Sequence, residues 1–168
     1  MTQAFHSPSL FRPTGVNFRS VGPADEPFLA GLHASRRHDA LTQVDWPPEQ
    51  KAKFLLDELR EEEAHFAEHY PGIERLVVEL GTLPIGRVYV QRVLGEIRLL
   101  DIALTPRARN CNIGTSLMRE LLNESRATGA RIVVHVEPEN AAKRLFARLG
   151  FATLEHRGGY DFMAWDPA

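Results

Sequence analysis

The order of strand and helix patterns is the feature that most constrains how this chain can fold. Residues 73–80, 85–93 and 96–104 are apolar or alternating segments that short turns with glycine or proline separate. That spacing is typical of an antiparallel meander. The pattern then changes to helix, strand and helix between residues 113 and 149. A strand–helix–strand crossover needs a parallel pair, so the sequence predicts a mixed sheet of the α/β (α+β) class.

Weaker patterns on either side supply the remaining elements. Alternation of apolar and polar residues predicts strands, and apolar residues at helical spacing predict helices. We expect strands at 16–21, 151–154 and 160–165, and helices after Gly22 and over 47–70. The acidic residues of the second helix, among them Glu62 and Glu63, are expected to form a solvated face.

The length of 168 residues suits one domain. Residues 1–14 contain two prolines and show no sustained period. We therefore expect a flexible N-terminal arm over 1–14 and a single domain over 15–168.

Composition excludes several classes of protein. The formal net charge of −2 argues against a nucleic-acid binder, which normally carries a strong basic excess. No segment approaches the ~18 apolar residues of a membrane span, and the N-terminus does not resemble a signal peptide. The single cysteine, Cys111, cannot form a disulfide within the chain, and the histidines lack metal-ligand spacing. We therefore expect a soluble, cytoplasmic protein without a metal, and with no nucleic-acid or membrane partner.

The turn after Leu104 is the strongest candidate for a binding site. A strand ends there, and an amphipathic helix begins a few residues later. Backbone N–H groups at a helix start lack partners within the helix, and the helix dipole is positive there, so the turn suits a pyrophosphate. Gly114 permits close approach of the backbone, Arg109 adds a charge and Thr115 a hydroxyl. An ordinary strand–helix turn remains the alternative.

Two motifs in this order resemble those of the GCN5-related N-acetyltransferase (GNAT) superfamily of acyl-CoA-dependent transferases. The family carries Arg/Gln-x-x-Gly-x-Gly/Ala between its fourth strand and third helix, and residues 109–114 match it at Arg109 and Gly114. Asn112 stands at the first glycine, and asparagine tolerates left-handed geometry best after glycine. Residues 140–151 resemble the family's Asn-x-x-Ala…Tyr-x-x-x-Gly-Phe. The resemblance covers about residues 16–165.

The resemblance implies a mostly antiparallel central sheet with a splayed parallel pair, flanked by about four helices. It implies acetyl-CoA as acyl donor and direct transfer of the acetyl group to a small-molecule or peptide amine. A homodimer is kept as an alternative by analogy. The residues that it implies for cofactor binding are Ile102, Ala103, Leu104, Arg109, Asn110, Cys111, Asn112, Ile113, Gly114, Thr115, Asn140 and Phe146.

The catalytic base is less well defined. An amine is mostly ammonium near pH 7, so a base or a water relay to one is useful. The family's commonest glutamate position corresponds to Arg98, which cannot act as a base at pH 7. Glu96 lies on the same face of that strand, and Asp101 is expected on the opposite face. Both are candidate bases, although Asp101 in its apolar surroundings is either a structural ion pair or a group with a raised pKa.

Departures from the family pattern keep other functions open. Phe146 stands where many members have a tyrosine that protonates the departing thiolate, and it cannot do so. A catalytically weak acyl-CoA-binding module is therefore an alternative. His135 and Glu137 are further candidates for proton transfer, with structural roles as the alternative. A third reading is a hydrolase that uses Cys111 as its nucleophile beside a helix N-terminus.

The acceptor site is expected between residues 32 and 70 and on the later strands. Polar residues of the first stretch either line an acceptor pocket or lie on the surface. They are His33, Arg36, Arg37, His38, Asp39 and Trp46.

Overall fold

The computed structural model describes residues 15–168, and the arm expected over 1–14 lies outside the described residues. In the described part, seven strands form one sheet in the order β1-β2-β3-β4-β5-β7-β6. They are β1 (Val16–Ser20), β2 (Glu74–Leu80), β3 (Leu83–Val93), β4 (Glu96–Leu104), β5 (Arg131–Val136), β6 (Ala152–Arg157) and β7 (Tyr160–Trp165). All neighbours are antiparallel except β4 and β5, which are parallel. The mixed sheet expected from the sequence is confirmed.

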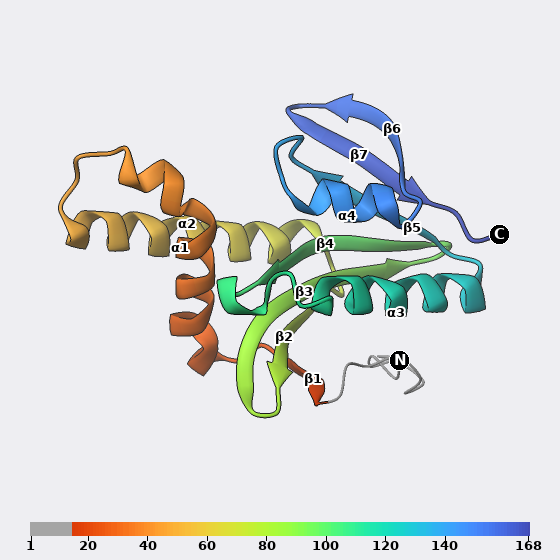
Figure 1. Ribbon diagram of the computed structural model, residues 1–168, viewed down its shortest axis with the longest axis horizontal. Coiled ribbons are helices and arrows are strands. Elements are labelled where there is room, and N and C mark those ends of the chain that lie inside the picture. Colours follow the sequence, from red (N-terminus) through yellow and green to blue (C-terminus); the bar gives the residue numbers. More distant parts are fainter. Residues whose placement is uncertain (1–14) are drawn as a thin grey trace.

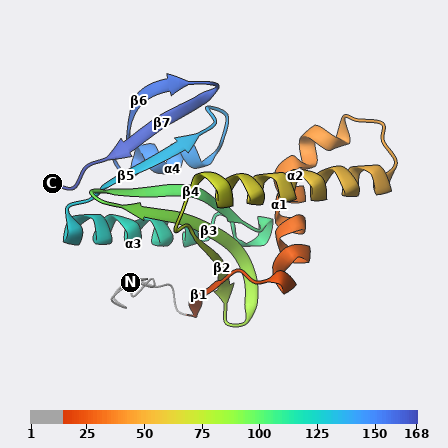
Figure 2. The same ribbon diagram turned by 180° about the vertical axis from the view of Figure 1, so that it is seen from behind.

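From residue 15 onward, four α-helices accompany the sheet, as the family resemblance implies. They are α1 (Glu26–Thr42), α2 (Pro48–His69), α3 (Ile113–Thr128) and α4 (Ala142–Arg148), with short 3-10 turns η1 (Pro23–Asp25) and η2 (Pro106–Ala108). The two opposite views show α3 and α4 on one face of the sheet and α2 on the other (Figure 1, Figure 2). No helix of residues 15–168 combines the length and the apolar character that a membrane span requires.

The core lies between the sheet and α3. The apolar stripe of α3 includes Met118 and Leu121, which are almost fully buried against Val90, Leu99 and Ile132 of the central strands. Burial of each large apolar side chain stabilises the fold by about 1.5–3 kcal/mol. This packing holds the first turn of α3 beside the carboxyl end of β4.

The parallel strands β4 and β5 diverge at their carboxyl ends. They pair only from Glu96 opposite Arg131 to Leu99 opposite Val134. Beyond these residues β4 continues to Leu104 and β5 to Val136 without pairing with each other. We call this opening the fork, and it confirms the expected splayed pair.

A β-bulge in β4 changes the face on which Asp101 lies. The register pairs Val90 with Leu99 and Tyr89 with Asp101, so Leu100 is an extra residue. Directly paired residues of antiparallel strands share a face, and one inserted residue reverses the alternation that follows. Asp101 therefore shares a face with Arg98, and the expectation of the opposite face was wrong. Simple alternation contains no sign of an inserted residue.

Candidate active site

The loop between β4 and α3 presents a row of free backbone N–H groups. Asn110 and Asn112 adopt left-handed φ angles of 57° and 60°, the geometry that asparagine tolerates. Asn112 is the N-cap of α3. Among the described residues, none accepts a hydrogen bond from the backbone N–H groups of residues 110–115. These amides and the positive end of the helix dipole together form a site suited to an anion.

Arg109 connects this loop to α1. Its Nε donates to the carbonyl oxygen of Leu104 at 3.1 Å, and its Nη2 donates to the hydroxyl of Ser35 at 3.4 Å. The guanidinium therefore lies over the carboxyl end of β4, next to the free amides. This position is suited to the second half of a pyrophosphate site, because the charge and the amides face the same region.

The exposed thiol of Cys111 has no base among its contacts within residues 15–168. Its Sγ lies 3.4 Å from the carbonyl oxygen of Arg109 and 3.8 Å from that of Arg107. A backbone carbonyl accepts a hydrogen bond from a thiol but cannot remove its proton at neutral pH. The surroundings therefore give no support to a cysteine nucleophile.

Two glycines near the fork differ in whether the surrounding structure leaves space for a side chain. A Cβ on Gly114 would lie 3.5 Å from Cδ2 of Leu145, an ordinary contact, so internal packing does not require glycine there. A Cβ on Gly86 of β3 would lie 2.4 Å from the carbonyl oxygen of Ala103. Gly86 thus permits the close approach of β3 to the end of β4. This role of Gly86 was not expected from the sequence, although a glycine inside an alternating strand is the usual sign of such an approach.

The second motif lies on the β5 side of the fork. Asn140 Oδ1 accepts a hydrogen bond of 2.9 Å from the N–H of Ala142, at the start of α4. Phe146 is 1% exposed and packs with its ring centroid 5.4 Å from that of Phe151. Phe146 is therefore part of the core that supports α4.

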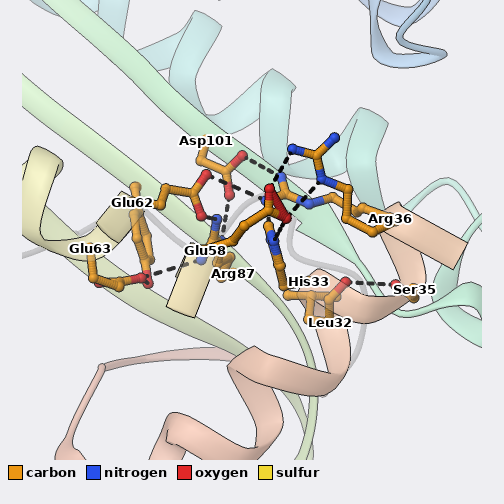
Figure 3. Close-up of polar contacts among 11 residues, drawn as sticks. Leu32, His33, Ser35, Arg36, Glu58, Glu62, Glu63, Arg87 and Asp101 are labelled. Atoms are coloured by element: carbon orange, nitrogen blue, oxygen red, sulfur yellow. Dashed lines mark hydrogen bonds and ion pairs between the residues drawn. The ribbon is translucent and has the colours of Figure 1, made fainter. Parts of the chain in front are cut away.

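Asp101 belongs to an ion cluster between α1, α2 and the sheet (Figure 3). Arg87 is 1% exposed, and its guanidinium lies 2.5 Å from Asp101, 2.8 Å from Glu62 and 3.3 Å from Glu63. Arg36 donates to the other oxygen of Asp101 at 2.9 Å. Burial alone would lower the pKa of Arg87, but the charges of Asp101 and Glu62 raise it above its ordinary value. Asp101 is therefore held by two charged arginines.

The ion cluster also corrects the reading of α2. Glu62 and Glu63 were expected on a solvated face, yet both contact the buried Arg87. Glu63 in addition accepts a hydrogen bond of 2.6 Å from the hydroxyl of Tyr89. Charged groups at helical spacing do not show whether a cation lies opposite them, and Arg87 comes from a distant strand. These bonds fix α2 against the sheet.

The expected acceptor residues divide into three sets. His33 and Arg37 contact Glu58 of α2 at 3.1 and 3.0 Å, and Arg36 is in the ion cluster. His38 and Asp39 line a shallow groove beside Arg109. Trp46 packs edge-on against Phe54 with ring centroids 5.4 Å apart. The structure therefore does not gather them into one pocket.

A pocket of about 340 Å³ lies at the fork instead, and we call it the fork pocket. Its lining comes from the end of α2 and from four strands: Tyr70, Glu96, Arg98, Leu99, Leu100, Val133, His135, Glu155, Arg157 and Phe162. Arg98 donates to Glu96 at 2.6 Å, and Arg157 donates to Glu155 at 2.8 Å. The pocket therefore combines an apolar floor with two paired charges of each sign.

Only part of the expected proton-transfer set enters the fork pocket. Glu96 and His135 line it, whereas Asp101 faces the ion cluster and Glu137 lies past the end of β5. Partial burial lowers the pKa of His135, and the positive charges of Arg157 and Arg98 lower it further against the opposing effect of Glu96. His135 is therefore held in its neutral form near pH 7.

Comparison with known proteins places this geometry in context. The family model described as acetyltransferase (GNAT) family matches residues 38–151. No curated protein matches the chain in sequence. Among solved structures, PaiA N-acetyltransferase from Thermoplasma acidophilum, in complex with coenzyme A, is similar with a TM-score of 0.67 and 15% identity, over 90% of this chain and 98% of that chain.

Two other solved structures differ from each other in the acceptor that they name. Spermidine N-acetyltransferase from Vibrio cholerae, in complex with CoA and spermine, has a TM-score of 0.59 and 20% identity, over 90% of this chain and 94% of that chain. The ribosomal-protein-S18-alanine N-acetyltransferase from Escherichia coli has a TM-score of 0.58 and 20% identity, over 91% and 94%. At such identities the likeness shows the shared fold alone.

Proposed function

The chain belongs to the acetyltransferase (GNAT) family, and we propose that it is an N-acetyltransferase that moves an acetyl group from acetyl-CoA to an amine. One observation carries the proposal: the row of free amides in the loop follows directly on the unpaired carboxyl end of β4 at the fork. A phosphate-bearing donor suits the amides and the open strand edge, and a small acceptor suits the fork pocket.

Acetyl-CoA supplies an acetyl group that is activated as a thioester. Residues 110–115 would hold its pyrophosphate through backbone N–H groups, with Arg109 as the neighbouring charge. The unpaired edge of β4 at residues 102–104 would bond its pantetheine arm, because β5 has diverged there. Asn140 stands on the opposite side of the fork, at the start of α4. The orphaned amides and the open strand edge are two separate features that fit this donor.

Direct attack by the amine is the mechanism that we propose. An acyl-enzyme would need an activated nucleophile near the fork, and the contacts of Cys111 provide none. The acceptor would enter the fork pocket, whose size suits a small amine or the end of a peptide. Related structures name spermidine in one case and a protein alanine in another, so both acceptor classes stay within the proposal.

The two candidate bases on β4 differ in their geometry. Asp101 has its two oxygens on Arg87 and Arg36, which favours a role in positioning β4 and α1. Glu96 lies in the fork pocket, where it pairs with Arg98. It stands three residues before Leu99, the last residue of β4 that pairs with β5. Three residues of strand span about 10 Å, so Glu96 would act through a water relay.

A catalytically weak acyl-CoA-binding module is the second candidate function. The buried Phe146 favours it, because this side chain cannot protonate a departing thiolate. A panel of amines with acetyl-CoA, followed by release of free thiol, separates the two functions. Turnover with at least one amine supports the transferase. Binding of CoA in calorimetry without turnover across the panel supports the module, and no binding rejects both.

A further inference from the structure

His135 occupies the point where the fork opens. It directly follows Val134, the last residue of β5 that pairs with β4. Its ring lies beside that of Phe162, with centroids 4.8 Å apart, and it lines the fork pocket with Leu100. Within residues 15–168, its ring nitrogens have no hydrogen-bond partner. A titratable group is therefore free to exchange a proton with whatever occupies the pocket.

Partial burial and charged groups on β4 and β6 together set the protonation state of this ring. The titratable and charged residues that line the fork pocket with it are Glu96 and Arg98 of β4, Glu155 and Arg157 of β6, and Tyr70 at the end of α2. Each arginine is paired with the glutamate of its own strand. Partial burial lowers the pKa of His135 most, and the charges of Arg157 and Arg98 lower it further against the smaller opposing effect of Glu96. A neutral imidazole has one nitrogen with a free lone pair, which a proton acceptor needs.

The other candidates cannot reach the fork as directly. Glu96 is about 10 Å away along β4 at the usual rise of a strand. Asp101 lies near the fork, but its carboxylate is held by Arg87 and Arg36. Both of its oxygens are thus engaged in ion pairs that hold Arg36 and the buried Arg87 in place.

We propose that His135 is the catalytic residue that accepts the proton of the acceptor's ammonium group in the fork pocket. This assignment rests on the proposed acetyltransferase function. A ring nitrogen of His135 takes one proton from R–NH3⁺, and the freed lone pair forms the C–N bond to the acetyl carbon. The C–S bond breaks with its electron pair on sulfur, which takes a second proton from the attacking nitrogen through solvent. His135 then returns its proton to water.

Substitution of His135 by glutamine tests the assignment. Gln keeps much of the size and polarity but cannot accept a proton, so kcat/KM should fall about a hundredfold or more. The remaining kcat/KM should rise steadily with pH, because only the free amine then reacts. The inflection that the wild-type pH profile shows at the pKa of His135 should be absent. The affinity for CoA in calorimetry should not change. Added imidazole should restore part of the activity of His135→Ala. The exposed His65 offers a matched control, and His65→Gln should behave as wild type.

A titration of the unloaded protein gives a readout that does not depend on turnover. Histidine NMR should show His135 with a midpoint below the ordinary ~6.5. Arg157→Gln should move that midpoint upward, because it removes a positive charge near the ring. If His135→Gln keeps the wild-type rate and pH profile on an amine that the wild type acetylates, the assignment is overturned. If the wild type acetylates no amine of the panel, the proposed function fails and this assignment fails with it.

Discussion

Arg87 donates from Nε to Oδ2 of Asp101 at 2.5 Å, which joins β3 to β4 just beyond the bulge at Leu100. The same guanidinium reaches Glu62 and Glu63 of α2. One buried cation therefore ties together the strand that forms the fork and the helix whose end reaches the fork pocket. The arrangement gives Asp101 a positioning role, since its charge holds the scaffold in place.

Replacement of Asp101 by asparagine should therefore destabilise the fold. Removal of one partner of a buried ion pair typically lowers the free energy of unfolding by 3–5 kcal/mol, and we expect about 3 because Arg87 keeps Glu62 and Glu63. Urea denaturation measures this change. Lys53→Gln is the control, because Lys53 pairs with Asp57 at the surface and such pairs contribute below about 1 kcal/mol. Equal effects of the two substitutions would show that the ion cluster does not stabilise the protein.

The two glycines near the fork should separate folding from donor binding. Gly86→Ala should cost about 3 kcal/mol of stability, because the new methyl group meets the carbonyl oxygen of Ala103. Gly114→Ala should change stability by about 1 kcal/mol or less, since its methyl has room. It should still weaken CoA binding about tenfold by obstructing the amides of the loop. Calorimetry of a folded Gly114→Ala variant with wild-type affinity would contradict the assigned pyrophosphate site.

Cys111 should prove dispensable for the reaction. Within the described part of the chain its thiol bonds to backbone carbonyl oxygens alone, so Cys111→Ala should retain most of the wild-type turnover. A hydrolase that used this thiol would instead lose several orders of magnitude. A bulky thiol-blocking group should act differently from alanine and weaken CoA binding, because residue 111 lies within the row of free amides. Calorimetry before and after blocking checks this point.

Asp25 should make stability depend on acidity. Bonds from Arg19, and a 2.7 Å bond from the N–H of Gly22, lower the pKa of Asp25 from 3.8 to about 2 against the opposing effect of burial. A lowered pKa stabilises the fold above the ordinary value, and this contribution is lost as pH falls from about 4 toward 2. Arg19 is 40% exposed, so solvent screening reduces the contribution to about 1 kcal/mol. Urea midpoints of wild type and Asp25→Asn should converge over this range, and a constant gap would refute the linkage.

The sequence was sufficient for the main elements and for the mixed character of the sheet. The alternation over residues 85–93 and the helical spacing over α3 each depend on residues within a single element. The structure contains both elements where these patterns predict them. The left-handed Asn112 was likewise expected from its own chemistry, since few residues tolerate that geometry.

Features that depend on residues far apart along the chain could not be predicted from the sequence. The bulge at Leu100 reverses the face of Asp101, and only the register with β3 reveals it. The buried Arg87 lies 24 residues from its partner Glu63, so no local pattern joins them. The fork pocket similarly combines strands that are far apart along the chain. His135 could be named as a candidate from the sequence, but its place at the fork could not.

The charges around His135 should also decide which acceptors react. After partial burial, the positive charges of Arg157 and Arg98 lower the pKa of His135 more than Glu96 raises it, so the arginines act more strongly on the ring than Glu96 does. A second ammonium on the acceptor should therefore be repelled, and a carboxylate should be attracted. For two primary amines of equal length, one ending in a carboxylate and one in a second ammonium, we expect kcat/KM to favour the first about tenfold at low salt. Added salt should reduce the difference, because screening acts on partly exposed charges. Arg157→Gln should reduce the difference in kcat/KM between the two amines, because it removes a positive charge near the ring. The surface variant Lys53→Gln should leave that difference unchanged. An equal or higher kcat/KM for the diamine at low salt would show that the glutamates govern acceptor choice instead.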